Sequence, residues 1–243
     1  MPRPPAPKAQ ATKAASGPPM GLIGVVTAVL VVLVAVLVYL GSRSDNLEAS
    51  GSVDALPEGG GLVLNPEVGD DVPQVHIYDD FQCPFCGQLE ATSGETISEA
   101  AAAGDIKLTY TFMSFLDNSL GNDSSSRAAN AAVCSADADR LSEFVSSLFA
   151  RQPVQEGTGY ENETFFDAAG EAGIEGDALN TFTSCVETNQ YADYVSDMQT
   201  RATQDEVTSS PVVMIDGEPI TNEQLSGLLQ DPTSFQDLIA SQQ

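Results

Sequence analysis

The chain has 243 residues, 42% of them hydrophobic, which suffices for one large globular domain or two small ones and argues against a disordered protein. Its formal net charge is −26 at pH 7. All 35 acidic residues follow Ser44, against five basic residues there, so this part carries a charge of about −30. Because the phosphates of nucleic acid would be repelled by such a surface, the sequence excludes nucleic acid as a partner.

Residues 21–40 form an apolar run without a charged side chain. As a helix, about 20 residues span roughly 30 Å, the thickness of a bilayer's hydrocarbon core. A cleaved signal peptide usually has a shorter apolar region that ends at a small-x-small site, which this run lacks. A buried core helix is the other alternative, but polar segments flank the run on both sides. We therefore expect one uncleaved transmembrane anchor.

The charges around this run predict its orientation. Arg3, Lys8 and Lys13 precede it without any acid, and Arg43 is the only basic residue close behind it. The positive-inside rule then makes residues 1–20 a cytoplasmic tail and places the rest of the chain outside the cytoplasm. We expect a single-pass protein of the cell membrane whose exported part lies in an oxidising compartment, where disulfides persist.

The exported part divides into a linker and a folded domain. Residues 41–61 are rich in Gly, Ser, Asp and Glu, and we expect them to form a flexible linker. Residues 62–243 show the hydrophobic patterns of a folded domain. Alternating or short apolar segments predict strands at residues 62–64, 74–81, 106–112, 212–215 and 218–220.

Helical patterns lie between these strands. The stretch from residue 83 to about 103 has Pro84 at a first helical position and Gly104 as its end. Thr221 and Gln224 predict a capping box for a closing helix. The resulting order, βαβ, then a helical block, then ββα, predicts an α/β fold with a helical insertion at about residues 117–203. Within that block, helices are expected at about 124–149, 162–172, 177–188 and 190–202.

Cys83 and Cys86 are two residues apart at the junction of a strand and a helix. Such a pair can be a redox couple, half of a metal site or a fixed staple. Cys83 is expected at the helix start, where backbone N–H groups and the helix dipole favour a thiolate, and Cys86 almost one turn inside. We expect Cys83 to be exposed and nucleophilic with a lowered pKa, and Cys86 to be shielded and able to resolve a mixed disulfide.

Two segments together carry a family resemblance. DDFQCPFC at residues 79–86 follows a strand, and SSPVVMIDG at residues 209–217 follows the helical block. Over residues 62–240 the chain resembles the thioredoxin-fold thiol:disulfide oxidoreductases of the DsbA kind, particularly the membrane-anchored exported forms of actinobacteria. The resemblance implies that Pro211 is cis and faces the CxxC pair, and that the backbone of Ser210 pairs with an extended client peptide.

The dipeptide between the cysteines departs from the best-known form of this family. Pro84-Phe85 stands where that form has Pro-His, and a phenylalanine cannot stabilise a thiolate as a histidine can. We therefore expect a reduction potential between about −120 mV for DsbA and about −270 mV for thioredoxin, nearer the oxidising end. Phe81 and Phe85 are expected to pack in the core or to form an apolar rim that faces clients.

Cys134 and Cys185 remain. Four cysteines permit three pairings, and if the CxxC cysteines pair with each other, these two are left for one another inside the helical block. The resemblance likewise implies a second, structural disulfide in this region. Two free buried thiols are the alternative, which is rare in an exported protein.

Metal and cofactor sites are not indicated by the sequence. Zinc would need a second close cysteine pair or nearby histidines, and His76, the only histidine, is expected to be a structural strand residue. The chain has no cofactor motif of its own. Asp79 and Asp80 precede the cysteine pair, and one of them could relay protons to or from Cys86, although solvated loop acids are more common.

These observations predict a membrane-tethered oxidoreductase that forms disulfides in thiol-containing exported clients through Cys83 and Cys86. The resemblance implies reoxidation by a membrane quinone-linked partner of the DsbB or VKOR type. One alternative is a disulfide reductase or isomerase, for example in cytochrome c maturation. The other is a non-catalytic thioredoxin-fold module that binds an extended peptide along Ser210 and Pro211.

Overall fold

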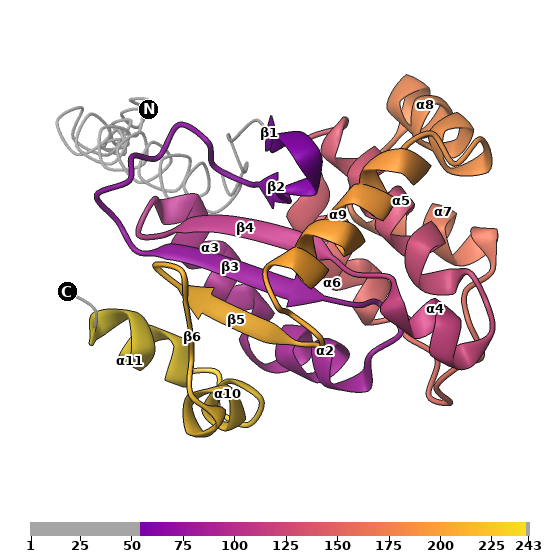
Figure 1. The fold of residues 1–243 in the computed structure, drawn as a ribbon. Helices are drawn as coiled ribbons and strands as arrows, with labels where there is room; N and C mark the ends of the chain where they lie inside the picture. The colour runs from indigo at the N-terminus through magenta and orange to yellow at the C-terminus, as the bar shows by residue number, and fades with distance from the viewer. Residues whose placement is uncertain (1–53, 242–243) are drawn as a thin grey trace, which may run out of the picture. The chain divides into compact units, whose positions relative to one another are not determined.

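A mixed β-sheet carries the fold of residues 54–241, the part of the chain that the computed structural model describes (Figure 1). The strands lie in the order β1-β2-β4-β3-β5-β6. Of the neighbouring pairs only β3 and β4 are parallel, which confirms the expected strand-helix-strand crossover. The strands are β1 (Asp54–Ala55), β2 (Leu62–Val63), β3 (Gln74–Asp79), β4 (Lys107–Phe112), β5 (Val212–Ile215) and β6 (Glu218–Pro219).

The helix expected after β3 consists of three parts. These are α2 (Pro84–Leu89), a π-helical turn, η2 (Glu90–Gly94), and α3 (Glu95–Ala103). Cys83 precedes α2 as its N-terminal cap with an extended backbone (φ −78°, ψ 120°), and Pro84 is the first helical residue, as predicted. Gly104 has a φ of 76° and ends α3, as predicted.

The side chains of β3 alternate between two packed layers. Ile77 points to the main core, where it is buried together with Leu89 of α2. Tyr78 points to the opposite face and forms a smaller cluster with Ala202 of α9 (Ala192–Gln204). Figure 1 shows α9 crossing one face of the sheet while α3 lies behind the other. The end of β3 is therefore buried on both faces, and this fixes the direction of the chain into α2.

Most of the helical insertion between β4 and β5 lies beyond one end of the sheet, and its last helix, α9, crosses one face (Figure 1). The expected helix at 124–149 is two helices, because the chain turns at Asp139, which has a φ of 53°. A short helix that the sequence patterns did not predict precedes them. The insertion comprises α4 (Phe115–Leu120), α5 (Ser124–Ala136), α6 (Leu141–Phe149), α7 (Asn162–Glu171), α8 (Gly176–Glu187) and α9.

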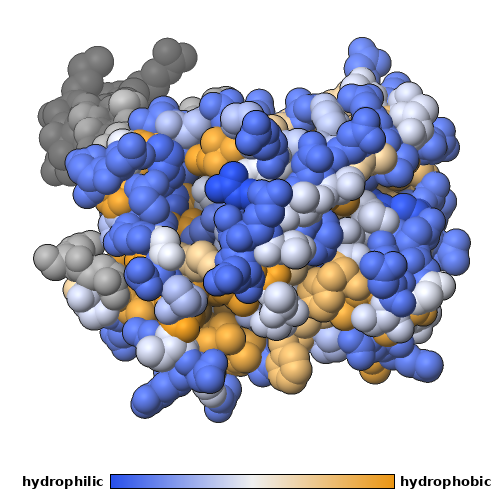
Figure 2. All heavy atoms as spheres, in the orientation of Figure 1, coloured by the Kyte–Doolittle hydropathy of each residue, from blue (hydrophilic) through white to orange (hydrophobic). Residues whose placement is uncertain are grey.

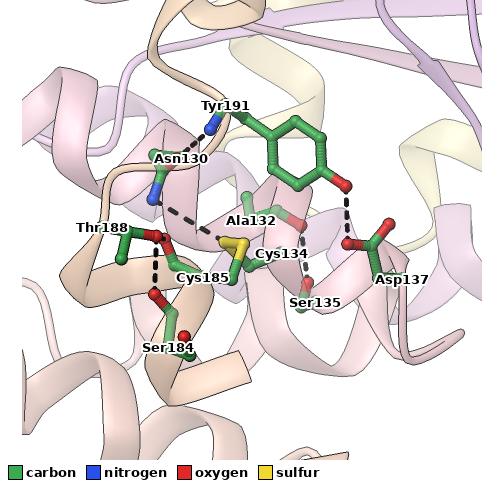
Figure 3. The surroundings of a disulfide bond; sticks show 9 residues. All are labelled: Asn130, Ala132, Cys134, Ser135, Asp137, Ser184, Cys185, Thr188 and Tyr191. Carbon is green, nitrogen blue, oxygen red and sulfur yellow. Dashed lines mark hydrogen bonds between the residues drawn. A yellow bond between two sulfur atoms is a disulfide. The ribbon is translucent and has the colours of Figure 1, made fainter. Parts of the chain in front are cut away.

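A disulfide joins Cys134 of α5 to Cys185 of α8, with their Cα atoms 6.0 Å apart (Figure 3). This pairing agrees with the one that the resemblance implies. Asn130 ties the bond to the start of α9: its amide nitrogen donates to the Cys134 sulfur at 3.7 Å, and its oxygen accepts from the Tyr191 backbone N–H at 2.8 Å. Both cysteines are buried, so the bond joins α5 and α8 from within the insertion, and Asn130 of α5 links them to the start of α9.

The C-terminal part follows the sequence patterns closely. β5 and β6 form the expected hairpin, whose turn at Asp216 and Gly217 has positive φ values of 53° and 82°. The capping box of Thr221 and Gln224 is present and begins α10 (Asn222–Leu228). A further helix, α11 (Ser234–Ala240), closes the described chain.

The folded unit begins earlier than expected. Residues 54–61, which were assigned to the linker at 41–61, form β1 and a 3-10 turn, η1 (Pro57–Gly59). Strand β1 pairs with β2, and the Tyr194 hydroxyl of α9 donates to the Gly61 carbonyl at 2.7 Å. These contacts make the segment part of the sheet, although its Gly- and acid-rich composition is typical of a linker.

The expected tail at residues 1–20 and the expected anchor at 21–40 lie outside the described residues, as does most of the expected linker. Within residues 54–241 there is no helix that is both long and apolar enough to cross a membrane.

The surface of the described domain is dominated by acids. Hydrophilic residues predominate on the face shown in Figure 2, with hydrophobic residues gathered mainly in the lower half of the view, where α2 and α10 lie. The ion pairs are few and join Lys107 to Asp70, Arg127 to Asp123, Arg151 to Glu171, and Arg201 to Asp205. Most basic side chains of residues 54–241 are thus paired, and most of the carboxylates there have no basic partner.

We predict that replacing Cys134 and Cys185 together by alanine destabilises the fold by about 4 kcal/mol, because the bond closes a loop with a sequence separation of 51 residues. Urea unfolding followed by circular dichroism measures the loss. The matched control replaces Cys83 and Cys86 by alanine, which opens no long loop and should cost much less. Equal stability of the two double variants would contradict the prediction.

Candidate active site

The CxxC pair lies at the turn between β3 and α2. Both cysteines are free thiols in this structure. The turn is closed by a hydrogen bond from the Cys83 backbone N–H to the Asp80 carbonyl at 2.8 Å. Cys83 is 6% exposed and Cys86 is fully buried. The expectation that Cys83 is exposed is therefore wrong in degree, because the segment before β5 lies against its sulfur.

That segment contains Ser210 and Pro211, and the peptide bond between them is cis. The Cys83 sulfur lies 3.4 Å from the Ser210 carbonyl oxygen, to which its thiol can donate. Residues 127 positions apart in the sequence thus meet at the reactive sulfur. The Ser210 hydroxyl is buried, and within the described structure it has no hydrogen-bond partner. A donor held in this way can turn to a thiolate on Cys83, a role that the sequence analysis did not give to this side chain.

The two sulfurs differ sharply in acidity. The pKa of Cys83 is lowered to about 6, first by a hydrogen bond from the Cys86 thiol, against the opposing effect of burial, with further help from Ser210 and the backbone N–H groups of Cys86 and Phe85. Burial, together with the hydrogen bond to Cys83, raises the pKa of Cys86 well above its usual value. At neutral pH the pair therefore holds one thiolate, on Cys83, and one thiol.

Asp79 is the acid that faces this pair. It is 2% exposed, and burial raises its pKa to about 8, while a hydrogen bond with Cys86 acts in the opposite direction and the charge of Glu90 adds to the rise. One carboxyl oxygen, Oδ1, has no hydrogen-bond partner within the described structure. A carboxyl group that is protonated near neutral pH and touches Cys86 can give a proton to that sulfur or take one from it.

Asp80 is held differently, although it is the next residue. Its Oδ1 accepts hydrogen bonds from the Gln82 backbone N–H at 2.9 Å and from the Ser125 hydroxyl at 2.5 Å. Its Oδ2 accepts one from the Leu116 backbone N–H at 3.3 Å. Burial raises the pKa of Asp80 to about 6 in spite of these bonds. Asp80 therefore ties the turn before the cysteines to the start of the insertion and is not free to relay protons.

The two phenylalanines near the cysteine pair differ in burial. Phe81 is fully buried and stacks near Phe112 and Phe149, with ring centroids 4.9 and 4.8 Å away. Phe85, between the two cysteines, is 59% exposed and leaves an apolar ring on the surface beside Cys83. Of the two phenylalanines considered in the sequence, one thus packs the core and the other forms part of a rim.

His76 does not belong to the site. It lies on the face of β3 opposite to Ile77 and Asp79, with its Nε2 2.8 Å from the Thr111 hydroxyl and its ring stacked on Tyr78 at 4.1 Å. Burial lowers its pKa to about 4, so the ring is neutral at physiological pH. The prediction of a structural strand residue agrees with this placement.

We predict that Asp79→Asn flattens the pH dependence of stability. The pKa of Asp79 is near 4 in an unfolded chain and about 8 in the fold, so the folded protein binds this proton more tightly. Its contribution to stability is complete below about pH 4 and is lost as the pH rises toward 8. Burial also raises the pKa values of Glu90 and Asp80, so some loss of stability with rising pH should remain in the variant.

Urea unfolding of the reduced protein at pH 5 and pH 8 measures this effect. The wild type should lose on the order of a few kcal/mol more than the Asp79→Asn variant between these values, since one pKa unit corresponds to about 1.4 kcal/mol. Asp71→Asn, at an exposed position, serves as the control. Parallel pH profiles for the wild type and Asp79→Asn would refute the assignment.

Comparison with known proteins places this arrangement in a family. Residues 70–231 match the family model described as thioredoxin. No curated protein sequence matches the chain. DsbA from Mycobacterium tuberculosis, in its reduced form, is 25% identical with a TM-score of 0.54, and the match covers 80% of this chain and 96% of that one.

Two further solved structures share the fold at lower identity. MdbA, a thiol-disulfide oxidoreductase from Actinomyces oris, is 21% identical with a TM-score of 0.60, covering 70% of this chain and 80% of that one. MdbA from Corynebacterium diphtheriae is 22% identical with a TM-score of 0.59, covering 76% and 98%. The family model spans about two thirds of the sequence and includes both β3 with its cysteine turn and the cis-proline segment. The chain belongs to the thioredoxin family.

Proposed function

We propose that this thiol:disulfide oxidoreductase forms disulfide bonds in exported proteins by exchange through Cys83 and Cys86. The observation that carries the proposal is the inequality of the two sulfurs, with the Cys83 pKa lowered to about 6 and the Cys86 pKa well above its usual value. A pair whose reduced form is stabilised as a thiolate is readily reduced, so its disulfide is an oxidant.

In the first step a client thiolate attacks the Cys83 sulfur of the oxidised pair. The bond between Cys83 and Cys86 breaks, a mixed disulfide forms at Cys83, and Cys86 leaves as a thiolate. Asp79 touches Cys86 and is protonated near neutral pH, so it supplies the proton that this leaving sulfur takes up.

In the second step another thiol of the client attacks the client sulfur of the mixed disulfide, and its proton passes to the Asp79 carboxylate. Cys83 leaves as a thiolate, stabilised by the Cys86 thiol and by the N–H groups at the start of α2. Two electrons have then passed from the client to the pair, and the client carries a new disulfide. Reoxidation returns those electrons to a membrane partner, which we propose to be quinone-linked and of the DsbB or VKOR type.

The segment at Ser210 and Pro211 is the proposed docking edge for an extended client. The Ser210 carbonyl oxygen lies 3.4 Å from the Cys83 sulfur and accepts from it when Cys83 is a protonated thiol. In a mixed disulfide the sulfur carries no hydrogen, so this carbonyl is free to accept a backbone N–H of the client. The exposed ring of Phe85 offers an apolar contact next to the same sulfur.

We also propose that the domain is tethered to the outer side of the cell membrane, as in the actinobacterial forms that the sequence resembles. The apolar run at 21–40 and the basic residues before it support a single anchor with a cytoplasmic N-terminus. The Cys134–Cys185 disulfide is consistent with an oxidising compartment. A tether keeps the pair near both translocating clients and a membrane partner.

We predict that a Cys86→Ser variant accumulates mixed disulfides with exported proteins, because Cys83 remains nucleophilic while the resolving thiol is lost. Non-reducing gels and mass spectrometry of the trapped adducts measure this. A membrane-impermeant phosphine added to intact protoplasts should release the clients if the domain faces outward. Cys83→Ser is the control and should trap nothing. A Cys86→Ser variant without adducts, or full cellular function of Cys83→Ser, would favour a non-catalytic peptide-binding module.

A reductase or isomerase is the second candidate, and Phe85 is the observation in its favour, since this side chain gives the thiolate no hydrogen bond. We predict a reduction potential between about −270 and −120 mV, nearer the upper value, because the Cys86 thiol stabilises Cys83 instead. Equilibration of the pair with glutathione measures the potential. A value at or below that of thioredoxin would make the protein a reductase.

A further inference from the structure

We propose that Gln152, in the loop between α6 and α7, is a positioning residue that holds the backbone of Cys83 and so sets how strongly its sulfur is stabilised as a thiolate. The inference rests on the redox role proposed above for the cysteine pair. It makes the helical insertion a determinant of that chemistry, where sequence patterns indicated only a structural addition.

Gln152 reaches the turn before α2 with its side-chain amide. The Nε2 group donates one hydrogen bond to the Phe81 carbonyl at 2.8 Å and another to the Cys83 carbonyl at 2.9 Å. The two amide hydrogens therefore bind the carbonyls of the residues immediately before and after Gln82. The backbone N–H of Gln152 donates to the Phe149 carbonyl at 3.0 Å, which fixes the residue to the end of α6.

The Cys83 carbonyl is the point where the insertion and the redox helix meet. It accepts the first helical hydrogen bonds of α2, from the N–H groups of Cys86 at 3.1 Å and Gly87 at 3.2 Å, in addition to the Gln152 amide. Among the hydrogen bonds of the described residues, Gln152 provides the side-chain donor to this carbonyl. The orientation of the Cys83 carbonyl therefore depends on a residue 69 positions away in the sequence.

Packing holds the amide in this place. A Cβ atom at Gly87 would lie 2.5 Å from the Gln152 Oε1, so the absence of a side chain at Gly87 makes room for the amide over the first turn of α2. A second side chain of the same loop supports the neighbouring carbonyl: the Tyr160 hydroxyl donates to Phe81 at 2.7 Å. Among the described hydrogen bonds, Tyr160 donates to the Phe81 carbonyl and not to the Cys83 carbonyl, and this distinguishes its role from that of Gln152.

The orientation of Cys83 matters because it is the cap residue of α2, so its side chain lies at the helix start. There the Cys86 thiol and, to a smaller extent, the backbone N–H groups of Cys86 and Phe85 favour the thiolate. Without the Gln152 amide, the hydrogen bonds left to the Cys83 carbonyl among the described residues are those from within α2. The sulfur then spends less time in this geometry, and the thiolate is less favoured.

The test compares Gln152→Met with the wild type, using the full chain in detergent. Methionine fills a similar volume and has no donor. Thiolate absorbance near 240 nm against pH gives the pKa of Cys83, and equilibration with glutathione gives the redox equilibrium constant. We expect the acid dissociation constant of Cys83 to fall at least threefold in the variant, with a shift of the glutathione equilibrium toward the oxidised pair. Gln155→Met, at an exposed position of the same loop, is the matched control and should change neither quantity.

A second variant, Gly87→Ala, displaces the amide without removing it and should shift both quantities in the same direction. The double variant should shift them no further than Gln152→Met alone, since both changes act on one contact. Additive shifts, or a Gln152→Met variant with wild-type values, would overturn the proposal. If Gln152→Met does not fold, the Gly87→Ala shift decides alone. A wild-type pair that forms no reversible disulfide with glutathione would instead refute the proposed function, and the Cys83 pKa would still test Gln152.

Discussion

The pairing of Cys83 with Cys86 at the first turn of α2 is the constraint that the rest of the site serves. It makes one sulfur an acid with a pKa of about 6 and the other a thiol that keeps its proton. It requires Cys83 at the cap of α2 and Cys86 inside the helix, which the buried end of β3 and the turn closed on Asp80 provide. It also requires that water be kept from Cys86, and the main core of the domain does this.

The helical insertion contributes to the same arrangement from outside the βαβ and ββα halves. Ser125 of α5 holds Asp80, and Gln152 and Tyr160 hold the carbonyls on either side of Gln82. These contacts depend on the insertion having a fixed shape, which the buried disulfide between α5 and α8 gives it from within (Figure 3). Loss of that disulfide should therefore change the geometry of the Cys83–Cys86 pair as well as lower the free energy of unfolding.

Much of this fold was accessible from the sequence where the signal is local. The period of β3, the capping box at Thr221 and the turn at Asp216 are set by neighbouring residues, and each appears where it was expected. Local patterns did not predict the burial of Cys83, because the segment that covers it lies 127 positions away and is placed near the pair only by the family resemblance. Gln152 carried no signal at all, since a single glutamine in a loop has no pattern, and its role arises only from where the loop folds back.

Charge conservation explains why an acid as deeply buried as Asp79 is tolerated beside the pair. Burial and, in smaller part, the charge of a thiolate on Cys83 raise the pKa of Asp79, so the reduced site carries a single negative charge with the carboxyl neutral. When a client opens the oxidised pair, the charge that arrives with its thiolate passes to Cys86, and the Asp79 proton neutralises that sulfur while the carboxyl becomes the anion. The oxidised site is neutral, and the mixed disulfide carries one charge, on Asp79. The reduced site again carries one, on Cys83, once the proton of the second client thiol has passed to the carboxylate, so no stage holds two charges. Because burial makes a second charge costly, the same desolvation that raises the pKa of Asp79 drives its proton onto Cys86 or back again as the pair changes state.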